Sequence, residues 1–128
     1  MMGQIEGRDN ALRVCLVHGR GTARKIVGRA LEERLQTPVH EYRCCEDALN
    51  YMEHYDTFVV YNNFGKRMNG AQGVARLRRL RPDAVILGVT SSPGYRHRFR
   101  AAGADDVVLL SGNEIAELTE KVQRHTAA

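Results

Sequence analysis

Residues 84–89 read Ala-Val-Ile-Leu-Gly-Val and decide the fold of this chain. The run is continuous, apolar and short, and the turn-forming residues Ser91, Ser92, Pro93 and Gly94 follow it after Thr90. Such a run is typical of a parallel β-strand that is buried on both faces of its sheet. The sequence therefore predicts a central parallel strand, which helices on both sides must cover.

The same alternation of short apolar runs and helical periodicity continues in both directions from this strand. Further strands are expected at 14–17, 39–42, 58–61 and 107–110, and the run 39–42 alternates as an edge strand does. Apolar residues at helical spacing predict helices at 23–35, 48–55, 74–80, 95–102 and 115–122. The residues expected to face the core include Ala23, Ile26, Val27, Ala30, Leu31, Leu35, Val74, Leu77 and Leu80. Ser111 and Glu114 have the spacing of a capping box for the last helix.

Five successive strand–helix units predict an α/β, flavodoxin-like (βα)5 fold. Parallel strands need right-handed helical crossovers, so helices cover both faces of the sheet in a three-layer sandwich. The simplest arrangement is a parallel five-stranded sheet of order 2-1-3-4-5. Its crevice is expected at the carboxyl ends of the strands, near the switch point between the first and third strands. The residues aimed there are His18, Gly19, Tyr61, Asn62, Thr90, Leu110 and Ser111.

Length and composition fit one domain. The chain has 128 residues, of which 43% are hydrophobic and 27% charged, and no apolar run approaches the roughly 20 residues of a membrane helix. Three cysteines, Cys15, Cys44 and Cys45, are an odd number and indicate reduced, cytoplasmic usage. Residues 5–8 read Ile-Glu-Gly-Arg, which resembles the factor Xa recognition sequence, so 1–8 are expected to be a tag or protease-site scar and 9–128 the domain.

Four segments resemble the receiver domain of two-component response regulators. They are Tyr-Asp-Thr-Phe-Val-Val at 55–60, Met-Asn-Gly at 68–70, Leu-Arg-Arg-Leu-Arg-Pro-Asp at 77–83 and Ala-Gly-Ala-Asp-Asp at 102–106. The resemblance extends from about residue 12 to residue 125. It implies a signalling module of a two-component-type regulatory system, and the expected scar at 1–8 suggests a domain excised from a larger regulator.

The positions of the receiver phosphorylation site depart from this family. His18 and Gly19 stand where the resemblance implies two magnesium-binding acids, and Leu110 stands where it implies a lysine. The phosphoacceptor aspartate is replaced by Asn62, counted from Gly70, or by Tyr61, counted along the strand. The resemblance also implies an aromatic switch residue in the fifth strand, where Val107 stands, and a hydroxyl after the fourth strand, which Thr90 supplies. Thr90 is thus the only one of these five features that the sequence keeps.

An acyl phosphate requires a carboxylate nucleophile and a hard cation held by oxygen ligands. Neither asparagine nor tyrosine forms an acyl phosphate, and no acid is available at positions 18 and 19. The sequence therefore predicts an atypical, phosphorylation-independent pseudo-receiver without a metal, cofactor or catalytic residues. It is expected to act through protein–protein interaction or dimerisation, with a kinase, a regulator, an output domain or a second copy as its partner.

The charge is concentrated in one stretch. The net charge is +4, and 76–100 contain seven arginines against the single acid Asp83. In receiver domains, the face formed by the fourth and fifth helices and the strand between them is the usual output and dimer surface. On this chain the candidate partner face is Tyr95, Arg96, Arg98 and Arg100, because interfaces are enriched in arginine and aromatic residues.

Two alternatives stay open. The crevice lined by His18, Asn62, Thr90 and Ser111 is a candidate site for a small anion or nucleotide, although the Gly-Arg-Gly at 19–21 lacks the third glycine of a dinucleotide fingerprint. The arginine-rich face is a candidate nucleic-acid surface, but direct binding is less favoured because seven arginines on two helices need not form one stripe. No nucleophile–base pair converges on the crevice, so an enzyme ranks last.

Overall fold

Five parallel strands form the central layer of the computed structural model, which describes residues 12–64 and 67–127. They are β1 (Val14–Val17), β2 (Val39–Tyr42), β3 (Thr57–Tyr61), β4 (Val85–Thr90) and β5 (Asp106–Leu109). Their order is β2-β1-β3-β4-β5, and all four pairings are parallel. This confirms the predicted flavodoxin-like fold and places β2 at an edge. The expected scar at 1–8 lies outside the described residues.

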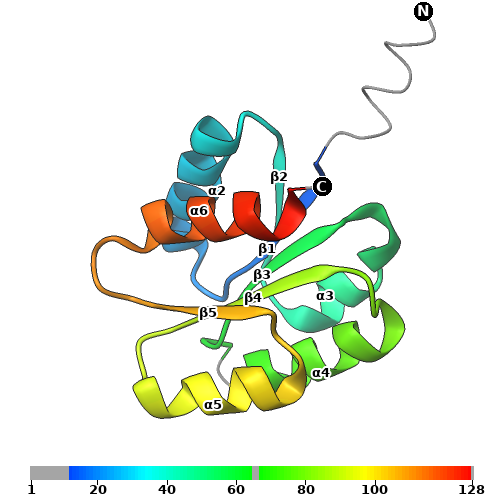
Figure 1. Cartoon of the computed structure of the whole chain (residues 1–128). Helices are drawn as coiled ribbons and strands as arrows, with labels where there is room; N and C mark the ends of the chain where they lie inside the picture. The colour runs from blue at the N-terminus through cyan, green and yellow to red at the C-terminus, as the bar shows by residue number, and fades with distance from the viewer. Residues whose placement is uncertain (1–11, 65–66, 128) are drawn as a thin grey trace, which may run out of the picture.

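Helices cover both faces of the sheet (Figure 1). The helices α2 (Gly21–Leu35) and α6 (Glu114–Thr126) lie on one face, and α3 (Cys45–Leu49), α4 (Gly70–Leu80) and α5 (Pro93–Ala102) lie on the other. A 3-10 helix, η1 (Met52–His54), joins α3 to β3. No helix in the described ranges is long and apolar enough to cross a membrane.

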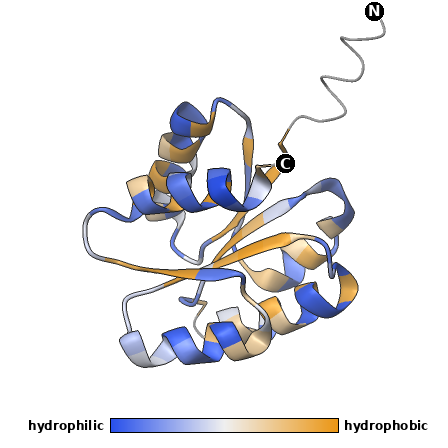
Figure 2. Cartoon of the chain, in the orientation of Figure 1, coloured by the Kyte–Doolittle hydropathy of each residue, from blue (hydrophilic) through white to orange (hydrophobic). Residues whose placement is uncertain are grey.

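The sheet separates two apolar cores. Leu16, Val59 and Leu87 face α2 and α6, whereas Val17, Val60 and Ile86 face α3, α4 and α5. Successive residues of a strand point to opposite faces, and both faces are covered. Apart from Gly88 and the buried threonines Thr57 and Thr90, every residue of β1, β3 and β4 is apolar, as the continuous runs predicted. Figure 2 shows these strands as an apolar band between helices with polar outer faces.

Phe99 fastens α5 to the sheet. Its ring is fully buried and packs directly against the backbone of two glycines. A Cβ atom on Gly88 would lie 2.5 Å from the Cγ of Phe99, and one on Gly70 would lie 2.9 Å from its Cζ. The ring of Tyr95 meets Phe99 edge-on, with 5.0 Å between the centroids. The helix therefore has no free space in which to slide over β4.

Several local predictions were wrong, each for a physical reason. The segment 48–55 is not one helix, because Arg81 donates from Nη1 to the carbonyl oxygens of Met52 and Tyr55 and holds the chain in η1 and an extended turn. Ile26 and Leu80 were expected in the core but are 65% and 51% exposed, since the buried stripe of α2 follows Val27 and Leu31 and α4 ends at Leu80.

The capping prediction was also wrong. The N-cap of α6 is Asn113 rather than Ser111, and the side chain of Asn113 makes no capping hydrogen bond. Glu114 instead accepts a bond from the amide of Gly112 at 2.9 Å. A capping box does occur at the start of α4, where Asn69 and Gln72 each accept from the other's backbone amide.

Candidate functional site

The predicted crevice residues do meet at the carboxyl ends of the strands, but on two different faces of the sheet. Tyr61 pairs with Val89 in the β3–β4 register, which brings Asn62 level with Thr90. Tyr61 belongs to the core beneath α2 and α6, so by alternation Asn62 and Thr90 share the opposite face. Asn62 is therefore the residue beside Thr90, and Tyr61 lies on the side of α2 and α6.

The position after His18 is closed by the β3–α4 loop. The amide of Gly19 donates to the side-chain oxygen of Asn63 at 3.1 Å. A Cβ atom on Gly19 would lie 2.0 Å from the carbonyl oxygen of Asn63 and 3.3 Å from the ring of Phe64. Any side chain at position 19, an acid included, would therefore require this loop to move.

His18 is buried and neutral. Its Nδ1 accepts a bond from the amide of Arg20 at 3.1 Å and lies 3.5 Å from the side-chain nitrogen of Asn63, so the proton sits on Nε2. Burial, with the nearby charges of Arg24 and Arg20, lowers the pKa of His18 to about 4. The ring packs against Tyr61, with 4.2 Å between the centroids. These contacts tie the His18 ring to β3 and to the start of α2.

Two further strand-end residues are Thr90 and Leu110. Thr90 is fully buried, and its hydroxyl accepts a bond from the amide of Ser92 at 3.1 Å at the start of α5. Leu110 is 41% exposed at the end of β5. Among residues 12–64 and 67–127, no group of three or more histidine, cysteine or acidic residues is arranged to hold a metal ion.

A cleft of about 330 Å³ opens beside these residues, on the side of α2 and α6. The His18–Tyr61 pair, Asn62, Arg20, Leu110 and Glu114 line it. Thr90 and Ser111, which the sequence placed in this crevice, do not line it, because the strands alternate and the loop after β5 carries Ser111 away. Ser91, next to Thr90, and Leu110, next to Ser111, line it instead. The sequence analysis did not place Glu114 in the crevice, because an acidic residue at the start of a helix is typical of ordinary helix surface.

The candidate partner residues on α5 point in two directions. Arg96 and Arg100 are exposed and share one helix face at a spacing of four. Arg98 instead lies over the ring of Tyr95, 4.7 Å from its centroid, and the Tyr95 hydroxyl accepts from the amide of Ala71 in α4. Tyr95 and Arg98 thus belong to the α4 side, and Arg96 and Arg100 to the side of β5.

Asp106, at the start of β5, is the centre of a cationic cluster that sequence patterns did not show. Lys121 and His125 of α6 lie 3.2 and 3.3 Å from its Oδ2, and Arg100 of α5 lies 3.6 Å from its Oδ1. Arg124 reaches Oδ2 at 4.0 Å. Burial acts to raise the pKa of Asp106, but hydrogen bonds from His125, Lys121 and the Val107 amide, with the charge of Lys121, together lower this pKa. One carboxylate therefore faces four basic side chains.

Two of the seven arginines in 76–100 are committed to the fold. Arg78 donates to the carbonyl oxygens of Gly103, Pro82 and Ala84 and pairs with Asp105 at 2.7 Å. Arg81 binds the backbone before β3, as described above. The remaining arginines lie on separate helices, which accords with the expectation that they form no single stripe.

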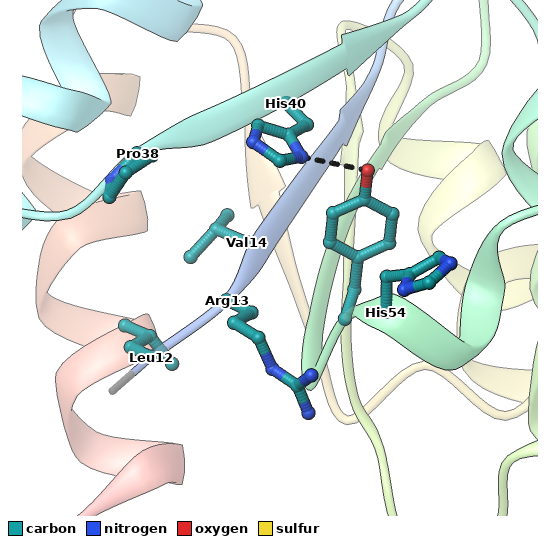
Figure 3. A pocket seen from close by; sticks show the side chains of 7 residues that line it. Leu12, Arg13, Val14, Pro38, His40 and His54 are labelled. Atoms are coloured by element: carbon teal, nitrogen blue, oxygen red, sulfur yellow. Dashed lines mark hydrogen bonds between the residues drawn. The ribbon is translucent and has the colours of Figure 1, made fainter. Parts of the chain in front are cut away.

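A second, smaller cavity of about 130 Å³ lies at the opposite, amino-terminal end of the strands (Figure 3). His40 and His54 line it, and the His40 Nδ1 bonds to the Tyr55 hydroxyl at 2.9 Å, which also bonds to Tyr42. These contacts join β2 to the segment before β3. The cavity lies far from the strand ends where the switch-point residues gather.

The fold is the one found in solved receiver domains of response regulators. No family model matches the sequence, and no curated protein matches it. Solved structures do. A putative response regulator from Chloroflexus aurantiacus superposes with a TM-score of 0.81 at 20% identity, over 91% of this chain and 98% of that one.

Two further structures show the range of these similarities. The Thermotoga maritima response regulator TrrA, solved in complex with Mg²⁺ and BeF, gives a TM-score of 0.80 at 24% identity over 90% of this chain and 99% of that one. The orphan response regulator HP1043 of H. pylori gives 0.75 at 18% identity over 91% and 98%. At these identities the comparisons establish the receiver fold.

Proposed function

We propose that this chain is a pseudo-receiver: a signalling module of a two-component-type system that works without phosphoryl transfer and acts by binding another protein. The observation that carries the proposal is the closed position at Gly19. The loop oxygen of Asn63 occupies the space that a side chain at position 19 would need.

The neighbouring residues support the same conclusion. His18 turns its Nδ1 to the backbone of Arg20 and its ring to Tyr61, so it presents no oxygen ligand to a cation. Asn62 has no carboxylate to accept a phosphoryl group. Leu110 offers no charge to neutralise one, and the hydroxyl of Thr90 is already engaged with Ser92.

A titration of isotope-labelled protein with Mg²⁺ and beryllofluoride tests the first half of the proposal. We expect no saturable shift of the backbone amides of Gly19, Asn62 and Thr90. A receiver domain that carries the complete acidic site is the positive control under the same conditions. Saturable shifts of these amides would contradict a phosphorylation-independent module.

We place the partner contact on the face of α5, β5 and α6. Arg96 is exposed beside Arg100, and around Asp106 the cations Arg100, Lys121 and Arg124 outnumber the acids Asp106 and Glu120. Charge complementarity steers partners and selects among them. The preferred partner is therefore an acidic surface of a kinase, a regulator or an output domain, rather than another copy of the same basic face.

The variant Arg96→Glu/Arg100→Glu tests this placement. Proteins captured by the immobilised domain are compared for the parent, for the double variant and for Arg29→Glu, which changes an exposed arginine on α2. We expect the double variant alone to lose acidic partners, at least tenfold in apparent affinity, because reversed charges meet like charges across the contact. Equal capture by all three proteins would contradict the assignment of this face.

A further inference from the structure

The cleft between α2 and α6 contains a polar group that the fold does not use. Tyr61 is 2% exposed and lines the cleft, yet its hydroxyl has no hydrogen-bond partner among the described residues. Buried hydroxyls are nearly always hydrogen-bonded, because an unsatisfied one retains the full cost of its desolvation. The hydroxyl of Tyr61 therefore requires an explanation.

The wall formed by α2 offers positive potential. Arg20 is the N-cap of α2 and lines the cleft, and its side chain does not cap the helix. The first turn of α2 contains no acidic residue. The unpaired amides and the dipole of a helix N-terminus attract a negatively charged group, and the guanidinium of Arg20 adds a full charge.

The opposite wall offers the opposite charge. Glu114, the first residue of α6, lines the cleft and uses its Oε1 for the amide of Gly112. Its Oε2 accepts no bond from the residues that the structure describes. Between the two walls, Val27 and Leu110 supply apolar contact, and the neutral His18 supplies no charge.

We propose that this cleft binds a small zwitterion, an α-amino acid with an apolar side chain. Its carboxylate meets Arg20 and the start of α2 and accepts the hydroxyl of Tyr61. Its ammonium group meets Glu114, and its side chain packs on Val27 and Leu110. The volume of about 330 Å³ lies at the small end of the range for ligand pockets, which suits a molecule of this size.

The charge balance of the cleft argues against phosphate or a nucleotide as its ligand. A phosphate or nucleotide carries two or more negative charges, whereas this cleft offers one arginine and one glutamate, with a neutral histidine between them. The proposed site lies on the side of α2 and α6, where Asn62 lines it but Thr90 does not. It is independent of the proposed partner face, so either proposal can fail alone.

Binding is measured by calorimetry and by amide shifts with L-leucine and L-phenylalanine as probes. We expect saturable binding that shifts the amides at 21–23 and at Glu114. L-leucinamide and N-acetyl-L-leucine, which each lack one charge, should bind at least about tenfold more weakly, since a hydrogen bond to a charged group is worth one to two powers of ten. Inorganic phosphate should neither bind at the cleft nor compete.

Two substitutions locate the site. Tyr61→Phe should weaken binding about tenfold while the free protein keeps or raises its melting temperature, because the change removes an unsatisfied hydroxyl. Tyr51→Phe, at an exposed tyrosine outside the cleft, is the matched control. Glu114→Gln should abolish the preference for L-leucine over N-acetyl-L-leucine.

The inference is overturned if neither amino acid binds with a dissociation constant below about 10 mM, which corresponds to a binding free energy of about 3 kcal/mol. It is equally overturned if L-leucinamide and N-acetyl-L-leucine bind as well as L-leucine, if phosphate competes with L-leucine, or if Tyr61→Phe binds like the parent.

Discussion

Replacing Gly19 with alanine tests the closed strand end on which the proposed function depends. The substitution adds a single methyl group, and Gly19 does not have a positive φ, so the backbone accepts alanine without strain. The new Cβ would lie 2.0 Å from the carbonyl oxygen of Asn63. The loop must therefore move away, which breaks the bond from the Gly19 amide to Asn63 and disturbs the buried Phe64.

The expected cost follows from these contacts. Overpacking a closed site costs about 1–3 kcal/mol, and the lost hydrogen bond costs about 1 kcal/mol. Replacing glycine restricts the unfolded chain and returns about 0.4–1 kcal/mol. The net loss in the free energy of unfolding is then about 2 kcal/mol, which for a domain of this size lowers the melting temperature by roughly 6–10 °C.

Urea unfolding and thermal melting of Gly19→Ala are compared with those of Gly21→Ala. Gly21 begins α2, and its Cβ would meet nothing closer than the Nη2 of Arg24 at 3.9 Å. That variant should gain up to about 1 kcal/mol, because alanine is the better helix residue. If both variants are neutral or stabilising, the loop does not close over Gly19 and position 19 has room for an acid.

Three other measurements follow from the described contacts. Burial holds the pKa of His18 at about 4, below the roughly 6.5 of an unfolded chain, so the unfolded state takes up the proton first. The contribution of His18 to stability is full above pH 6.5 and falls by about 3 kcal/mol toward pH 4. His18→Asn, which keeps an acceptor near Nδ1, should lose that share of the pH dependence in urea titrations. An unchanged slope would contradict the burial of a neutral ring. Gly88→Ala should lower the free energy of unfolding by about 2 kcal/mol because its Cβ meets the Phe99 ring. In a double-mutant cycle with Phe99→Leu, the double variant should lose less stability than the sum of the two single variants. Strict additivity would place the clash elsewhere. Asn69→Ala removes the cap of α4 and should cost about 1 kcal/mol in thermal melts, and a neutral result would refute the capping box.

Periodicity was sufficient for the fold because the sheet is buried on both faces. The runs around Leu16, Val59 and Leu87 have no polar alternation, which only a covered parallel strand allows. The helices between them then fixed the topology through the handedness of the crossovers. Periodicity failed at Ile26 and Leu80, where a narrow buried stripe and a helix end decide exposure.

The strand ends were predicted as a set, but their chemistry was not. Asn62, His18 and Tyr61 do converge, yet which of them share a face depends on strand register and alternation. The contact of Asn63 with Gly19 depends on the path of a loop, for which the sequence has no periodic signal. The cluster around Asp106 joins residues from α5, β5 and α6 that lie up to 25 positions apart.

The ring of Phe99, seated against Gly88 and Gly70, has a consequence for how a cell would control this protein. A receiver that toggles between two shapes is governed by how often it is modified. Phe99 packs α5 against Gly88 and Gly70, and Thr90 is bonded to Ser92, so the proposed pseudo-receiver would work in this one arrangement. Under the proposed function, its output would be set by its abundance, because the fraction of partner occupied follows the ratio of its concentration to the dissociation constant.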